Sequence, residues 1–171
     1  DFPYLIKGNI LKEENNLEEA IENYKKSIKY NKNCYEAYYN MALCQSLLNQ
    51  NDEALNSIEE ALKINNNFPQ ALDAKGCILY SNKNYEDALK CYNELIEKDN
   101  TNPEYYFKKG SCERELKQYE EAIKSFDEVL KLNPEHAKAI LLTGSCYDYL
   151  NKKDWAMENY EKVIQKDSDN P

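Results

Sequence analysis

The sequence is poor in the residues that interrupt helices or build common catalytic sites. Its 171 residues include only 4 Gly, 5 Pro and 1 His, and Arg114 is the single arginine. Few Gly and Pro argue against an all-β or loop-rich protein. No stretch approaches the roughly 20 apolar residues of a membrane span. It also has no phosphate-binding Gly loop, nucleophile elbow or HExxH motif. We therefore predict neither an enzyme nor a membrane partner.

Basic charge and metal-binding cysteine patterns are also scarce. Lys and Arg number 22 against 31 Asp and Glu, a net charge of −9, and nucleic-acid binders normally carry a basic surface. The six Cys form no C-x-x-C pair and have no His at ligand spacing. We predict no nucleic-acid partner, no metal and no cofactor. The favoured state of the cysteines is free thiols in a reducing, cytoplasmic compartment.

What the sequence does contain is a repeat with a period of 34 residues and no gaps. We number positions 1 to 34 within each unit. Position 8 is always Gly or Ala, position 20 is always Ala, and positions 4, 24 and 28 are large and apolar. The five predicted units are residues 1–34, 35–68, 69–102, 103–136 and 137–170.

The spacing within each unit predicts two amphipathic helices, at about positions 1–14 and 18–30, because apolar residues recur at helical intervals. The small residues at positions 8 and 20 are expected where the two backbones approach closely. The connecting segments are rich in Asn, which tolerates left-handed conformations and binds its local backbone. Position 18 is acidic in every unit, which suits the positive start of the second helix.

This pattern resembles the tetratricopeptide repeat. The resemblance implies an all-α fold, a right-handed α-solenoid superhelix of antiparallel helix pairs. Position 11 departs from the pattern, with Gln45 and Glu113 where an apolar residue is usual, and predicts a looser or differently rotated first helix in those units. The fourth unit matches most fully, with Tyr106, Gly110, Tyr119, Ala122, Phe126 and Pro134.

The resemblance further implies that the first helix of each unit lines a concave groove for a peptide. At the positions that line the groove in this family, this sequence has several apolar side chains, which are unusual on a face exposed only to solvent. The charged residues at the same positions sum to a net charge of about −3. The candidate peptide-binding residues are Asn9, Tyr39, Asn40, Leu43, Leu47, Asp73, Cys77, Tyr80, Phe107, Lys108, Ser111, Arg114, Lys138, Leu141, Asp148 and Tyr149.

Two functions of different kinds follow. The first is a non-catalytic interaction scaffold that binds a protein or peptide segment with apolar and some basic residues. The clamp with which co-chaperones of this family hold an acidic tail is not expected, because Leu5, Gln70 and Ala74 replace its three cations. The alternative is a structural module that self-associates or that positions an attached domain of a larger protein.

The alternative rests on the two ends of the array. The sequence begins Asp1-Phe2-Pro3, and Pro171 stands at the first position of a sixth unit, so we expect a piece of a longer protein. A repeat array usually needs a polar end cap. The face around Val163 and Ile164 lacks one, and it is expected to pack against another subunit or further chain. This makes homo-oligomerisation through uncapped terminal repeats the expected form of self-association.

Overall fold

The structure is a computed structural model that describes residues 2–168, so the predicted start of a sixth unit at Pro171 lies outside the described residues. Within that range every regular element is an α-helix, as predicted, and the described helices number ten. They are α1 (Phe2–Glu13), α2 (Leu17–Tyr30), α3 (Tyr35–Leu47), α4 (Asn51–Ile64), α5 (Pro69–Ser81), α6 (Tyr85–Lys98), α7 (Pro103–Glu115), α8 (Tyr119–Leu132), α9 (Ala137–Tyr149) and α10 (Lys153–Ser168).

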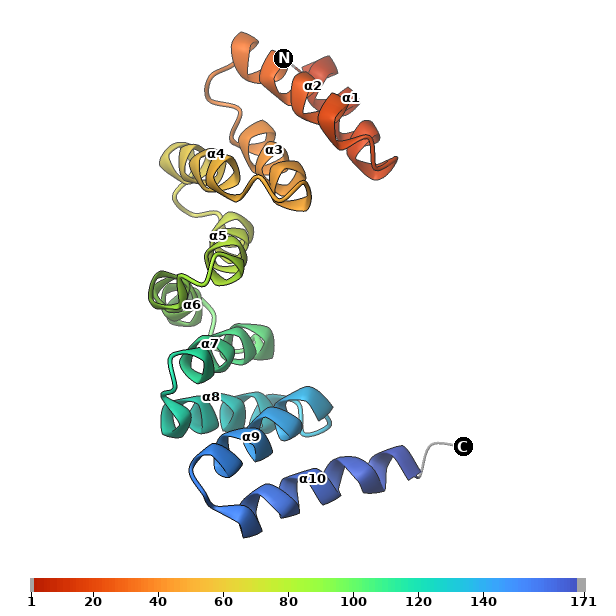
Figure 1. Cartoon of the computed structure of the whole chain (residues 1–171). Coiled ribbons are helices and arrows are strands. Elements are labelled where there is room, and N and C mark those ends of the chain that lie inside the picture. The colour runs from red at the N-terminus through yellow and green to blue at the C-terminus, as the bar shows by residue number, and fades with distance from the viewer. Residues whose placement is uncertain (1, 169–171) are drawn as a thin grey trace. The chain divides into compact units, whose positions relative to one another are not determined.

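The chain divides into two compact units, residues 1–84 and 85–171. The division falls between α5 and α6, the two helices of the predicted third repeat. In the first unit α1 pairs with α2 and α3 with α4, and α2 packs on α3 (Figure 1). In the second unit α7 pairs with α8 and α9 with α10, and α8 packs on α9.

The core of each unit lies where a second helix meets the next first helix. In the first unit Tyr24 is fully buried with Ile21, Ala37 and Cys44. In the second unit Phe126 and Ile123 occupy the equivalent positions against Ala139 and Cys146. The apolar side chains of each second helix therefore pack both against the first helix of the same repeat and against the first helix of the following repeat.

Glycine at position 8 makes room for an aromatic ring at position 24. A Cβ atom on Gly8 would lie 2.6 Å from Tyr24 Cε1, and one on Gly110 would lie 2.7 Å from Phe126 Cε1. The second repeat has Ala42 at position 8 and Ile58 at position 24. The two positions therefore vary together, with Gly facing a flat ring and Ala facing a branched aliphatic chain.

The turns inside each repeat share one left-handed residue. Position 15 has a φ between 57° and 62° in all five repeats. Asn at this position confirms the prediction that Asn ends the first helix, but two repeats use Lys instead. The left-handed residues are Asn15, Asn49, Lys83, Lys117 and Asn151.

The turns between repeats use the side chain at position 31. Asn31 Oδ1 accepts a hydrogen bond from the backbone N–H of Asn33 at 3.0 Å, and Asn65 Oδ1 accepts from that of Asn67 at 3.2 Å. Asp99 in the second unit accepts in the same way from Thr101. The asparagines expected in the turns thus act in two ways, through their backbone freedom at position 15 and through their side chain at position 31.

Candidate functional site: the faces of the first helices

In the first unit, α1, α3 and α5 lie side by side and bring several predicted groove residues together. Tyr39 on α3 is half-buried, and its ring lies 4.9 Å from that of Phe68. Burial raises the pKa of Tyr39, and the charges of Asp73 and Cys77 on α5 raise it further. The surface therefore carries a tyrosine with an acidic neighbour.

Leucines extend this surface along α3. Leu43 is half-buried and packs against the core beside Tyr39, whereas Leu47 is 65% exposed. An exposed leucine next to partly buried apolar groups offers an anchoring point for an apolar side chain of a partner. The first unit therefore presents an apolar strip with a carboxylate, Asp73, on the neighbouring helix.

The polar side chains at the α1 end of this surface are held by other residues. Lys12 Nζ donates to Asn40 Oδ1 at 2.6 Å, and Asn40 Nδ2 donates to the backbone oxygen of Glu36. Asn9 Oδ1 accepts a hydrogen bond from Tyr24 Oη at 2.9 Å. Because these bonds connect α1 to α2 and α3, the two asparagines support the surface and have less capacity left for a ligand.

In the second unit the ring of Phe107 packs against other rings of the protein, which leaves less of it available to contact a partner. Its ring centroid lies 5.9 Å from that of Phe126 and 4.9 Å from that of His136. His136 Nδ1 accepts a hydrogen bond from the backbone N–H of Ala139 and caps the start of α9. The only histidine thus has a structural role that its place in a turn did not reveal.

The other polar groups on α7 also have partners within their unit. Arg114 forms an ion pair with Glu115, and Ser111 Oγ donates to the backbone oxygen of Phe107. The Nζ atom of Lys108 lies 5.9 Å from the centre of the Tyr92 ring. Burial raises the pKa of the Cys146 thiol to about 11 although the Arg114 charge opposes the rise. Arg114 therefore lies close to α9 as well as on α7.

The most exposed aromatic group of α9 pairs with a residue that the sequence analysis missed. Tyr149 is 68% exposed, and its ring stacks on that of Tyr119 at 4.8 Å between centroids and 2° between planes. Tyr119 begins a second helix, α8, so the groove positions of the family did not include it. The signal available was that both tyrosines flank helix ends.

The predicted groove residues divide by exposure. None is fully buried, which is required of a binding surface. The exposed ones are Leu47, Cys77, Lys138, Leu141, Asp148 and Tyr149. The half-buried ones are Asn9, Tyr39, Asn40, Leu43, Asp73, Tyr80, Phe107, Lys108, Ser111 and Arg114.

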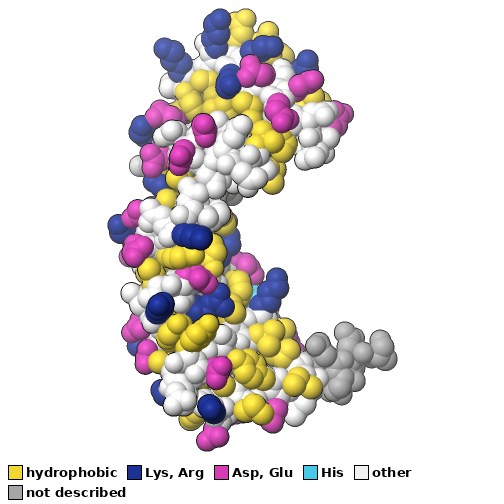
Figure 2. Space-filling model, viewed as in Figure 1, with side chains coloured by type: hydrophobic (Ala, Val, Ile, Leu, Met, Phe, Trp, Pro, Cys, Tyr) yellow, Lys and Arg dark blue, Asp and Glu magenta, His cyan; other side chains and the backbone are white. Residues whose placement is uncertain are grey.

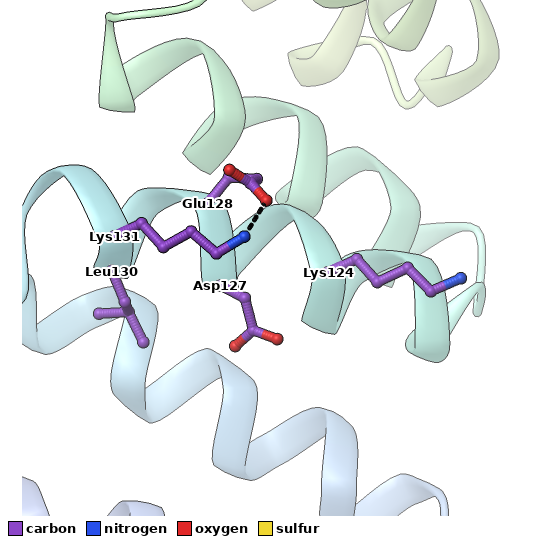
Figure 3. Close-up of a pocket in the computed structure, with 5 residues that line it drawn as sticks. All are labelled: Lys124, Asp127, Glu128, Leu130 and Lys131. Carbon is purple, nitrogen blue, oxygen red and sulfur yellow. Dashed lines mark hydrogen bonds and ion pairs between the residues drawn. The ribbon is translucent and has the colours of Figure 1, made fainter.

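Surface charge is mixed, and charged residues line the hollows on the second helices. Figure 2 shows Lys and Arg interspersed with Asp and Glu, and hydrophobic side chains at the surface over α9 and α10. One hollow is lined entirely by α8, and in it Glu128 binds Lys131 (Figure 3). Its charged side chains neutralise one another, so it offers less to a ligand than the apolar strip on α3.

Residues 2–168 contain no group of three or more His, Cys, Asp or Glu side chains placed to hold a metal ion. None of the helices described is both long and apolar enough to cross a bilayer.

Sequence models of known families match most of the chain. A model described as TPR repeat matches residues 8–46, and one described as tetratricopeptide repeat matches residues 35–68. A model of anaphase-promoting complex, cyclosome, subunit 3 matches residues 81–163. The chain is a tetratricopeptide repeat protein. No curated protein sequence matches this tetratricopeptide repeat chain.

Solved structures of tetratricopeptide repeat proteins share its fold. MamA 41-end from Desulfovibrio magneticus RS-1 is 22% identical over 98% of this chain and 94% of its own, with a TM-score of 0.93. A crystal structure of MamA is 17% identical over 95% of both chains, with a TM-score of 0.89. YrrB, described as a TPR protein with an unusual peptide-binding site, is 26% identical over 98% of this chain and 87% of its own, with a TM-score of 0.86. The predicted α-solenoid fold class is thereby confirmed.

Proposed function

We propose that this tetratricopeptide repeat protein is a non-catalytic scaffold that binds a peptide segment through the exposed faces of its first helices. The fold is that of protein-interaction scaffolds, and one similar structure, YrrB, is described as having a peptide-binding site. The observation that carries the proposal is the apolar strip of Tyr39, Leu43 and Leu47 on α3, with Asp73 beside it.

The chemistry of this strip selects the ligand. Leu47 and Leu43 favour an apolar side chain, because burying one apolar side chain contributes about 1.5–3 kcal/mol. Asp73 favours a Lys or Arg close to that side chain. The proposed ligand is therefore a segment in which a basic residue lies near a leucine or aromatic residue.

Selection of peptides from a random library on the immobilised protein tests the proposal. We expect enrichment of peptides that combine a basic and a large apolar residue, with affinity that falls as salt rises because the charges are partly exposed. Enrichment of acidic peptides, or of none, would contradict the proposal.

Two variants and one control then locate the binding surface by calorimetry with an enriched peptide. Leu47→Ser and Asp73→Lys should each weaken binding about tenfold or more, which corresponds to about 1.4 kcal/mol. Leu132→Ser is the matched control, because Leu132 is an exposed leucine at the end of the second helix α8. If Leu132→Ser weakens binding as much as Leu47→Ser does, the binding surface is not on the first helices.

A further inference from the structure

Three aromatic rings gather at the start of α3, inside the first unit. Tyr35 and Tyr39 lie one helical turn apart on α3, and Phe68 directly precedes α5. The Phe68 ring centroid lies 5.3 Å from that of Tyr35, with 79° between the ring planes. It lies 4.9 Å from that of Tyr39, with 59° between the planes. Each of the three side chains is half-buried, so this α3 aromatic cluster keeps part of its ring surface open to a ligand.

A carboxylate lies beside each tyrosine of the cluster. The Tyr35 hydroxyl donates a hydrogen bond to the Glu36 carboxylate, which raises the pKa of Tyr35, and the negative charge of Glu36 raises it further. Asp73 on α5 is close enough for its charge to add to the rise that burial causes in the pKa of Tyr39. A carboxylate has about four lone-pair sites, so Glu36 can accept further hydrogen bonds besides that from Tyr35.

Basic side chains are scarce around the cluster. Residues 35–68 contain five Asp or Glu and a single Lys, and α3 itself contains neither Lys nor Arg. That lysine, Lys63, pairs with Glu60 on the second helix α4. Lys75 on the neighbouring α5 pairs with Glu59 at 2.8 Å. The charge of this part of the first unit is therefore complementary to a basic group of a ligand.

The fourth repeat shows a nitrogen-bearing ring at the equivalent place. Its residue at position 34 is His136, and the His136 ring centroid lies 4.9 Å from that of Phe107 at position 5. His136 Nε2 lies 3.6 Å from Glu104 Oε1, and Glu104 is at position 2. The second repeat instead has Phe68 at position 34, and its side chain carries no N–H group. A ligand N–H group would there take the place that the imidazole has in the fourth repeat.

We propose that the α3 aromatic cluster binds an arginine side chain of the peptide ligand, with the guanidinium stacked on the rings and its N–H groups donating to Glu36 and Asp73. This inference rests on the proposed function, since it names the basic residue of the peptide. A guanidinium is flat and weakly hydrated and offers five N–H donors, whereas a lysine ammonium is a strongly hydrated point charge. Rings combined with carboxylates therefore favour Arg over Lys.

A titration with N-acetyl-arginine amide tests the site without any selected peptide. In NMR spectra the ring signals of Tyr39 and Phe68 should shift, with a dissociation constant in the millimolar range. N-acetyl-lysine amide should bind at least about threefold more weakly, because an ammonium cannot stack on a ring as a guanidinium does. Equal affinities for the two compounds, or no shift at roughly 50 mM of the arginine compound, would overturn the proposal.

A peptide selected on the immobilised protein separates this proposal from the proposed function. Replacing its arginine by lysine, or by citrulline, which keeps the shape and loses the charge, should weaken binding about tenfold. If the selected peptides carry lysine and no arginine, or if the lysine peptide binds equally well, the arginine site is wrong. The peptide-binding proposal would still stand in that case, provided that Leu47→Ser weakens binding of the same peptide.

Two variants locate the arginine, and the readout is the ratio of the affinities for the arginine and the lysine peptide. Phe68→Leu removes the ring and Glu36→Gln removes the charge, and each should reduce the ratio from about tenfold to about threefold or less. Because Phe68 also packs against the core, Glu36→Gln supplies a test that leaves this packing intact. An unchanged ratio in both variants would overturn the proposal.

Another aromatic pair of the first unit supplies the matched control. Tyr30 is 68% exposed, and its ring stacks on that of Tyr4 at 5.5 Å between centroids. Lys26 Nζ lies 6.0 Å from the centre of the Tyr4 ring, so a cation of the protein already accompanies this pair. Tyr30→Leu should therefore leave the ratio at about tenfold. If it lowers the ratio as much as Phe68→Leu does, the arginine does not bind at the α3 aromatic cluster.

Discussion

The second repeat, α3–α4, and the fourth, α7–α8, each join a helix of 13 residues to one of 14, yet they pack different side chains between them. At positions 8 and 24 the second repeat has Ala42 with Ile58, and the fourth has Gly110 with Phe126. The repeat therefore keeps a joint volume at these two positions, while the individual residues change together.

A second pair of contacting side chains differs in charge between the second and the fourth repeat. In the second repeat Ser57 Oγ donates to Gln45 Oε1 at 2.7 Å, and in the fourth Ser125 Oγ donates to Glu113 Oε2 at 2.6 Å. Both acceptors are buried at position 11, and in each case a serine on the second helix satisfies the polar group, so the departure from the family pattern leaves these side chains hydrogen-bonded. The fourth repeat differs in holding a carboxylate where the second holds a neutral amide.

The largest effect is expected from Gly110→Ala. The new Cβ atom would lie within 3 Å of the Phe126 ring, and we expect a loss of about 2–3 kcal/mol in unfolding free energy, measured by urea unfolding. Adding Phe126→Ile recreates the pair of the second repeat and should recover at least about 1 kcal/mol. If the double variant is less stable than Gly110→Ala alone, the two positions do not share a volume.

An intermediate effect is expected from Glu113→Gln, which gives the fourth repeat the neutral acceptor of the second. Burial raises the pKa of Glu113, although the Ser125 hydrogen bond and Lys109 oppose the rise. The folded state therefore binds a proton more tightly than the unfolded state, and wild-type stability falls as pH rises from about 4.5 through the raised folded pKa. Above that window we expect Glu113→Gln to be more stable by about 1 kcal/mol.

Urea unfolding at several pH values measures this difference. The advantage of Glu113→Gln should shrink as pH falls toward 4.5, the ordinary glutamate value, because the wild-type carboxyl is then protonated. The reciprocal change Gln45→Glu should destabilise the second repeat at neutral pH by a similar amount. Glu97→Gln, at an exposed position on α6, is the control and should show neither effect. An advantage that does not change with pH would rule out ionisation as its cause.

The smallest effect is expected at the left-handed turn residue, which is Asn49 in the second repeat and Lys117 in the fourth. Both have a φ of 60°, a conformation that Asn adopts more easily than Lys. Lys117→Asn should stabilise the protein by about 0.5 kcal/mol, and Asn49→Lys should destabilise it similarly. Thermal unfolding of the two variants would refute this account if both shifted the midpoint in the same direction.

Much of the fold follows from the sequence, because the same pattern of apolar, small and turn residues recurs five times along the chain. The period predicted the helices, and the Asn-rich turns predicted their ends. The two lysines at position 15 escaped notice because Lys carries no signal for a left-handed conformation, and only the register of the other repeats places them there. The serine partners of Gln45 and Glu113 lie on the second helix of each repeat, and their contact arises only when the two helices pack together.

From the sequence, the candidate site could be predicted only as a set of residue positions on the first helices, without the contacts that their side chains make. The family pattern indicated which face of each first helix is exposed, but it did not indicate what each side chain contacts. Lys12 binding to Asn40, and Tyr119 stacking on Tyr149, depend on lateral distances between helices from different repeats. Such distances are set by packing across the interface, and a single sequence does not encode them locally. The binding role of the surface therefore stays a prediction.

The buried glutamate of α7 also bears on how the array opens. In a repeat protein each repeat is held mainly by its neighbours, so a local penalty lowers the free energy of opening locally. At neutral pH the amide hydrogens of α7 are expected to exchange with solvent faster than those of α3, after correction for intrinsic rates. In mild acid the difference should narrow as Glu113 takes up its proton. The ionisation state of one side chain would then determine which of these two repeats opens more readily.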